Sequence, residues 1–114
     1  MIVIGEKLNS SIPSVYAAIE KKDSRFVSDL AVKQEEAGAH FLDINAGMFV
    51  EAEEENLRWL MNTVQAVSKL PLVIDTPDPS VALALAKEYR GEKPVINSVT
   101  LEENRFAPMV EAAK

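Results

Sequence analysis

Four short apolar runs, separated by stretches with helical spacing, make up the hydrophobic pattern of the chain. The runs cover residues 2–4, 41–44, 72–74 and 95–96, and each is followed by glycine or by an acid or amide. Their apolar character is nearly continuous rather than alternating, which is typical of parallel strands covered on both faces. The pattern therefore predicts four buried strands of a parallel sheet.

The stretches between the first two runs predict helices with recognisable ends. Residues 13–20 are expected to form a short helix or turn. A longer helix follows, which Asp23 or Ser24 caps and Gly38 ends. Apolar residues recur along it at helical spacing and are expected to share one buried face: Phe26, Val27, Leu30 and Ala31.

Two further helices are expected after the second and third runs. The first covers about residues 53–68 and carries an apolar stripe made of Leu57, Leu60, Met61, Val64 and Val67. Its acidic start, residues 51–55, lacks the spaced oxygen ligands and central glycine of a calcium loop, so these acids are expected to complement the helix dipole. The second begins at Asp78, with Pro79 in the first helical position, and ends by Gly91.

A last helix is expected after the fourth run. Thr100 and Glu103 have capping-box spacing, but Pro108 interrupts the pattern, so a short helix, a break and a new helix are predicted. Strand and helix thus alternate four times, which implies right-handed crossovers and an α/β fold with a parallel sheet. Two architectures fit residues 1–114 as a single domain: the first four units of an eight-stranded β/α barrel, or a small doubly wound sheet.

Composition narrows the classes of function. The net charge is −6 and the basic residues are scattered, which argues against partners such as nucleic acid or an anionic membrane. The first apolar run is only residues 2–4, too short for a signal peptide or a membrane span. The chain contains no cysteine, which fits a reducing cytoplasm and excludes thiolate chemistry.

Three isolated residues invite a functional role that their context does not favour. His40 is the only histidine and has no second nitrogen ligand, so a surface position is expected and no metal site is predicted. Trp59 and Tyr89 lie on predicted helices, away from the strand ends. They are expected to contribute packing rather than to stack on a ligand.

Polar side chains gather at the ends of all four predicted strands. Ligands bind at this edge of a parallel sheet in either architecture. An aspartate accepts two donors and an asparagine offers a donor and an acceptor, so Asp75 and Asn97 on neighbouring strands are expected to bracket a heterocycle such as the amino-pyrimidinone edge of a pterin. Single residues of this type usually form caps or turns. Four strand ends in register favour a ligand site instead, with these candidates: Glu6, Asn9, Asp43, Asn45, Gly47, Asp75, Thr76, Asn97 and Ser98.

The strand-end segments resemble a known family. They read IGEKLN, FLDINAG, LVIDT and VINSVT, and QEEAGA precedes the second of them. These motifs are similar to the first four strand ends of the methyltetrahydrofolate:corrinoid methyltransferases. That family shares a pterin-binding barrel with cobalamin-dependent methionine synthase and, more distantly, with dihydropteroate synthase. The resemblance covers essentially the whole chain.

The resemblance implies roles for individual residues. Asp75 and Asn97 correspond to residues that hydrogen-bond the pterin ring, and Asn9 and Ser98 become secondary contacts on the same rim. Asn45 lies in a DINAG segment where dihydropteroate synthases carry a different, glycine-rich sequence, which favours the methyltransferase branch. Glu6 and Asp43 complete the expected pterin-binding set.

The resemblance also implies a reaction in one-carbon metabolism. A methyl group would move between a ring nitrogen of tetrahydrofolate and the cobalt of a corrinoid (a cobalamin) held by a separate partner protein. No catalytic residue is assigned, because the family's catalytic amide comes from later strands. A half-barrel has unpaired edges, so either the chain is a fragment, or a homodimer or a complementary half closes the barrel. The 114-residue chain by itself is expected to be incomplete for catalysis. The alternatives are a non-catalytic α/β binding or assembly module and a dihydropteroate synthase-like enzyme.

Overall fold

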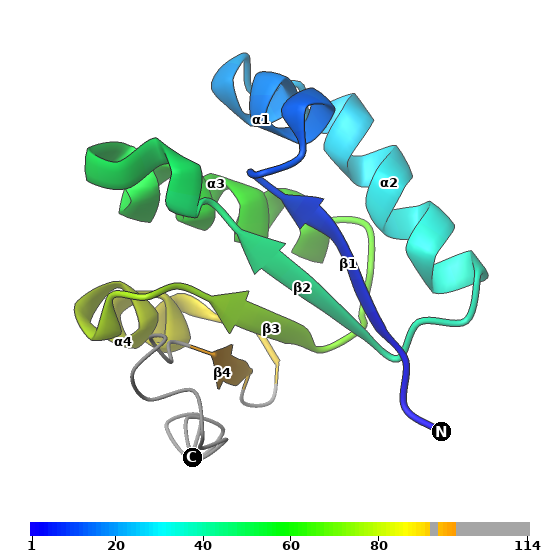
Figure 1. The fold of residues 1–114 in the computed structure, drawn as a ribbon. Helices are drawn as coiled ribbons and strands as arrows, with labels where there is room; N and C mark the ends of the chain where they lie inside the picture. The colour runs from blue at the N-terminus through cyan, green and yellow to red at the C-terminus, as the bar shows by residue number, and fades with distance from the viewer. Residues whose placement is uncertain (92–93, 98–114) are drawn as a thin grey trace.

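The computed structural model describes residues 1–91 and 94–97, which alternate strands and helices along the chain (Figure 1). Ser98 and the predicted last helix, with Thr100, Glu103 and Pro108, lie outside the described residues. The elements in chain order are β1 (Ile4–Asn9), α1 (Pro13–Glu20), α2 (Ser24–Glu36), β2 (Phe41–Asn45), the 3-10 helix η1 (Gly47–Ala52), α3 (Glu53–Gln65), β3 (Leu72–Asp75), α4 (Pro79–Glu88) and β4 (Val95–Asn97).

The strands form one parallel sheet in the order β1-β2-β3-β4, so sequence neighbours are also neighbours in space (Figure 1). A doubly wound sheet reverses its strand order at a switch point. The described strands contain no such reversal, and that alternative is wrong for them. Sequential parallel order is the order of consecutive strands in a β/α barrel.

A single apolar core joins the sheet to the helices. From the strands it contains Leu8, Leu42, Ile44, Leu72 and Ile74, and α1, α2, α3 and α4 all contribute side chains to it. Because side chains alternate along a strand, these residues all belong to one face of the sheet. The described helices therefore cover this face, and cover of the other face stays a prediction.

The helix ends follow the predicted signals closely. The Asp23 side chain accepts the Phe26 amide at the start of α2, and the Asp78 side chain accepts the Ser80 amide at the start of α4. The hydrogen bond from Ser80 also lowers the pKa of Asp78. Gly38 follows α2 with a φ of +104°, a conformation that glycine adopts without strain.

Several predicted boundaries and faces are wrong. The first strand begins and ends later than residues 2–4, and α3 ends at Gln65 rather than near residue 68. Val67 therefore lies beyond the helix and is 42% exposed. Phe26, in the first turn of α2, is 38% exposed, whereas Val27 and Ala31 are buried. For α3, helical spacing identified the buried stripe and the start at Glu53 but not the residue at which the helix ends.

The residues expected to pack or to lie at the surface do so. His40 is exposed, and its Nδ1 accepts the Val3 amide at 2.9 Å. Trp59 packs against the core, with the Lys22 ammonium 5.7 Å from its ring centre. The Tyr89 hydroxyl accepts the Leu72 amide at 3.0 Å. These contacts give all three aromatic rings a structural role.

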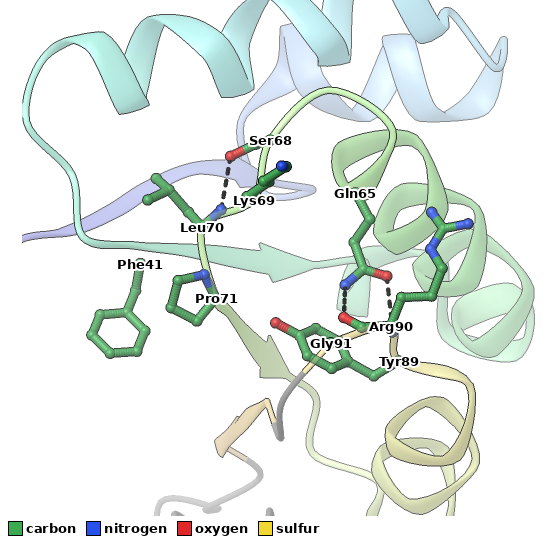
Figure 2. Close-up of a pocket in the computed structure, with 9 residues that line it drawn as sticks. All are labelled: Phe41, Gln65, Ser68, Lys69, Leu70, Pro71, Tyr89, Arg90 and Gly91. Carbon is green, nitrogen blue, oxygen red and sulfur yellow. Dashed lines mark hydrogen bonds between the residues drawn. The ribbon is translucent and has the colours of Figure 1, made fainter.

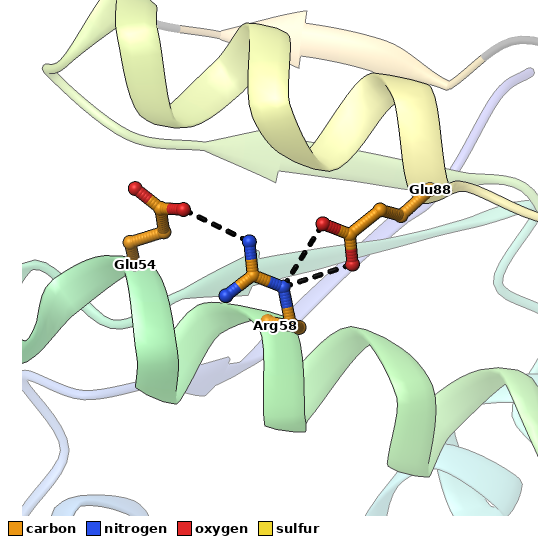
Figure 3. A network of polar contacts seen from close by, with 3 residues as sticks. All are labelled: Glu54, Arg58 and Glu88. Carbon is orange, nitrogen blue, oxygen red and sulfur yellow. Dashed lines mark hydrogen bonds and ion pairs between the residues drawn. The ribbon is translucent and has the colours of Figure 1, made fainter.

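An ion-pair network holds α4 against α3 on the outer surface (Figure 3). The Arg58 side chain contacts Glu54 and Glu88, each at 2.8 Å. Both acids are partly exposed, so the network adds little to stability. Within the described ranges, we found no helix with the length and apolar character that crossing a membrane requires.

Candidate functional site

Four amide or acid residues lie in one row across the carboxyl edge of the sheet. Asn9 pairs with Asn45, Asn45 with Asp75, and Asp75 with Asn97. Residues paired in a parallel sheet point to the same face, and the preceding residue of each strand points to the helices. The row Asn9, Asn45, Asp75 and Asn97 therefore lies on the face that the described helices leave open, as the strand-end pattern predicts.

Glu6 reaches the same face by a route that the sequence did not predict. It does not follow the first strand but lies within β1, at a bulge between Gly5 and Leu8. The bulge frees the Lys7 amide from the ladder, and Oε1 of Gln34 accepts it at 3.1 Å. Because Gly5 has no side chain, Gln34 can approach this closely: a Cβ on Gly5 would lie 2.5 Å from Oε1.

Asp43 and Asp75 form a hydrogen-bonded pair of acids on the open face. Burial, followed by the charge of Asp75, its hydrogen bond and the charge of Glu6, raises the pKa of Asp43 to about 8. Burial also raises the pKa of Asp75, although hydrogen bonds with Asn45 and Asp43 oppose that rise. Asp43 thus keeps its proton at neutral pH, while Asp75 is the better acceptor.

Asn45 links the row to the loop that follows β2. Its Oδ1 accepts the Gly47 amide at 2.9 Å and the Ser10 hydroxyl at 3.1 Å. The Ser10 hydroxyl in turn accepts the Met48 amide at 3.0 Å. With Oδ1 occupied, the amide of Asn45 remains available as a donor toward Asp75. Ser10, which is 2% exposed, was not among the predicted site residues.

The loop after β2 is also held against α1 by an aromatic pair. Tyr16 and Phe49 stack with ring centres 4.3 Å apart and ring planes inclined by 2°. Within η1, Val50 has a φ of +51°, a strained value for a β-branched residue. The rim of the site beside Asn45 is therefore fixed by packing and by hydrogen bonds at the cost of local strain.

Two of the predicted site residues have structural roles instead. Thr76 is fully buried on the helix side, because it is the residue after Asp75 and side chains alternate. Its hydroxyl donates to Glu53 at 2.6 Å and accepts the Asp78 amide at 3.1 Å. Gly47 serves the loop after β2 through its amide. Thr76 is thus wrong as a ligand contact and instead fixes the carboxyl end of β3 to α3.

Asn9 and Asn97 differ in whether their side-chain atoms already make hydrogen bonds within the protein. Oδ1 of Asn9 accepts the Ser11 amide at 2.8 Å, which closes the turn into α1. Asn97 is exposed, and its backbone carbonyl accepts the Thr76 amide at 2.9 Å. The structure therefore brings Glu6, Asp43, Asn45 and Asp75 together, with Asn9 and Asn97 at the two ends of the row.

The sequence of the chain matches a defined family over nearly its whole length. The pattern that characterises pterin binding enzymes matches residues 5–114. The chain belongs to the pterin-binding enzyme family. The family prediction made from the strand-end motifs is confirmed.

Individual relatives support membership of the pterin-binding family. A methylcorrinoid:tetrahydrofolate methyltransferase of Eubacterium limosum is 47% identical over 107 residues, which cover 93% of this chain and 39% of that protein. Methionine synthases of Mycobacterium leprae (strain TN) and Mycobacterium tuberculosis (strain ATCC 25618 / H37Rv) are 30% and 29% identical, covering 97% and 94% of this chain but 10% and 9% of those proteins. The chain thus spans about two-fifths of the first of these relatives and about a tenth of the others.

A cavity at the opposite end of the sheet does not belong to the polar row. It has a volume of about 690 Å³ and lies near the amino ends of β2 and β3, between Phe41, Pro71 and Tyr89 (Figure 2). Gln65 and Arg90 are fixed beside it, since the Gln65 amide donates to the Arg90 carbonyl at 2.8 Å. In β/α barrels this end serves stability, whereas ligands bind at the carboxyl end.

The acids of the site do not form a metal centre. Among residues 1–91 and 94–97, no group of three or more histidine, cysteine, aspartate or glutamate side chains has an arrangement that could hold an ion. Glu6, Asp43 and Asp75 share a face without converging on one point in that way.

Proposed function

We propose that the open face of the sheet binds the pterin ring of a tetrahydrofolate, with Asp75 and Asn97 as the central contacts. The observation that carries the proposal is the in-register row across four strands, which places an acid between amides. A pterin edge presents two N–H donors beside a carbonyl acceptor. An ionised Asp75 accepts such donors, and the neighbouring Asn97 offers both a donor and an acceptor.

The electrostatics of the row support a neutral ligand with hydrogen-bond donors. The charges of Glu6 and Asp75 make this face negative, so an anionic group would be repelled from it. A pterin ring is uncharged and flat, whereas the glutamate tail of a folate is anionic. We therefore expect the ring to lie against the row and the tail to extend away from it.

The proposed reaction moves a methyl group between the folate and the cobalt of a corrinoid on a partner protein. Its support is the 47% identity to a protein named methylcorrinoid:tetrahydrofolate methyltransferase. The leaving nitrogen of methyltetrahydrofolate needs protonation or strong hydrogen bonding, and we assign no described residue to that step. A reducing cytoplasmic location belongs to the same proposal, supported by the absence of cysteine from the sequence.

Closure of the sheet into a barrel is part of the proposal. In the described part of the chain, β1 and β4 each pair on one side only. Unpaired edges of a parallel sheet are stabilised by further strands. Additional β/α units, in the same polypeptide, in a second copy or in a complementary half, would cover the open face around the ligand.

Calorimetric titration with methyltetrahydrofolate tests the pterin assignment. Asp75→Ala and Asn97→Ala should each weaken binding by about tenfold or more, because each removes hydrogen bonds to the ligand. Asp29→Ala and Asn62→Ala are matched controls, since both residues are exposed on helices α2 and α3. Equal affinity across all five proteins would refute the assignment.

A further inference from the structure

We propose that Asp43 is a positioning residue of this site: its carboxylic acid group donates a hydrogen bond to the Asp75 carboxylate and holds it in place to accept from the ligand. The inference rests on the proposed pterin site and extends it to a residue that need not touch the ring. Asp43 is the most buried acid of the open face, since the whole residue is 7% exposed.

The geometry of the sheet brings the two acids together. Asp43 precedes Asn45 by two residues on β2, and Asn45 pairs directly with Asp75 on β3. Asp43 and Asp75 are therefore diagonal neighbours on one face of the sheet, where their side chains meet in a hydrogen bond. Asp43 itself pairs with Val73, so its immediate neighbour on β3 is apolar. A lone carboxylate in that position would be poorly solvated.

Every charged group that faces Asp43 from a neighbouring strand is an acid. β1 contributes Glu6 and β3 contributes Asp75, whereas β4 brings the uncharged Asn97 into the row. Lys7 lies beside Glu6 at the bulge, but the charges that shift the pKa of Asp43 are those of Asp75 and Glu6. The helices pack against the opposite face. Two adjacent acids without a facing cation cannot both ionise cheaply, so a shared proton relieves their repulsion.

The surroundings decide which acid holds the proton. A hydrogen bond from Asn45 stabilises the ionised form of Asp75. Among the described residues we find no such donor to Asp43, and burial together with the Asp75 charge raises the pKa of Asp43 to about 8. The neutral carboxylic acid of Asp43 is therefore the donor and the Asp75 carboxylate the acceptor.

This arrangement makes ligand binding depend on pH. Below about pH 8 Asp43 is protonated and holds Asp75 by a hydrogen bond. Above that pH, Asp43 ionises, loses its donor and repels the Asp75 carboxylate. Affinity for a ligand that donates to Asp75 should therefore be high at neutral pH and fall as the pH rises through that value.

The test compares affinity for methyltetrahydrofolate between pH 6 and pH 9.5 in the full chain with Asp43 intact, with Asp43→Asn and with Asp43→Ala. The amide of Asp43→Asn still donates but cannot titrate, so its affinity should stay within about threefold of the unaltered chain at pH 7 and remain flat with pH. Asp43→Ala should lose about tenfold at pH 7, as expected for one hydrogen bond to a charged group.

Asp29→Asn, on the exposed surface of α2, is the matched control and should retain the pH dependence of the unaltered chain. A purely structural role for Asp43 would lower affinity equally at every pH and would not be rescued by asparagine. Parallel pH profiles for the unaltered chain and Asp43→Asn would overturn the proposal.

A measurement without ligand separates this inference from the proposed function. Carbon-13 NMR of the aspartate carboxyl groups should show one resonance, absent in Asp43→Asn, that titrates near pH 8 in the free chain. Titration of that resonance below about pH 5, the ordinary range for aspartate, would overturn the proton-sharing pair. A high titration midpoint in a chain that binds no folate would uphold the pair and refute the pterin assignment alone.

Discussion

The two faces of the sheet carry opposite chemistry on the same strands. On β2, Leu42 and Ile44 are fully buried against the helices, whereas Asp43 and Asn45 point to the open face. The covered face is held by apolar packing, which does not depend on direction or pH. The open face is held by directional hydrogen bonds and by a shared proton. One strand thus supplies both the stability of the fold and the specificity of its site.

Residues of the covered face also hold the strands that carry the polar row. Thr76 follows Asp75 and points to the covered face, where Glu53 on α3 accepts its hydroxyl. Gln34 on α2 satisfies the bulge that directs Glu6 to the open face. Polar residues buried in the helix layer therefore help to fix the positions of acids on the other side of the sheet.

The largest expected effect comes from adjacent substitutions on opposite faces of β3. Ile74→Ala, on the covered face, should lower the free energy of unfolding by about 2–5 kcal/mol, because it leaves a cavity in the core. Asp75→Ala should cost less than half of that and act on ligand binding instead. Urea unfolding followed by circular dichroism measures both. Similar losses of stability for the two variants would contradict the division between the faces.

A smaller loss is expected at the bulge of β1. Gly5→Ala should cost about 1–3 kcal/mol, because the new methyl group would overlap the Gln34 side chain. The double variant with Gln34→Ala should recover part of that cost, since the two sites are in contact and their effects do not add. Thermal unfolding of both single variants and the double variant gives the coupling. Simple additivity would show that the close approach has no energetic consequence.

A pH-dependent effect is expected at Asp43. Its pKa rises from 3.8 to about 8 on folding, so the folded state binds more protons than the unfolded state between those values. Stability contributed by Asp43 is complete below pH 3.8 and falls as the pH rises through about 8. Asp43→Asn removes this loss, so the stability of the variant relative to the unaltered chain should rise steadily on going from pH 5 to pH 9. A gain that is the same at both pH values would contradict the assigned direction.

The smallest effect is expected for charges on the outer helix surface. Arg58→Ala breaks the contacts with Glu54 and Glu88 but should cost only about 0–1 kcal/mol, because these groups are partly exposed to water. That cost should shrink further when salt is added. Unfolding in low and high salt measures it. A cost above about 1 kcal/mol that does not change with salt would contradict the expected exposure of these ion pairs to water.

The sequence predicted the parts of the fold and site that depend on local pattern. Strand order and the row ending in Asp75 and Asn97 follow from alternating elements and from polar residues at strand ends. Helix starts at Asp23 and Asp78 follow from capping chemistry. Each of these signals lies within a few residues of the feature that it predicts.

The rest depends on contacts between distant segments. Gln34 meets the bulge 27 residues away, and Glu53 meets Thr76 over 23 residues. No spacing along the chain marks such pairs. The raised pKa of Asp43 likewise requires the strand pairing that places Asp75 beside it.

The bulge in β1 changes the parity of the strand. In a regular strand, residues separated by an odd number point to opposite faces, yet Glu6 and Asn9 share the open face while Gly5 and Leu8 share the covered one. Because the bulge contains one extra residue, the residues before it and after it still pair in register with β2. Removing Lys7 would produce a strand that alternates normally with the same residues inward and outward, so this strand can change length by one without exchanging its ligand face for its core face.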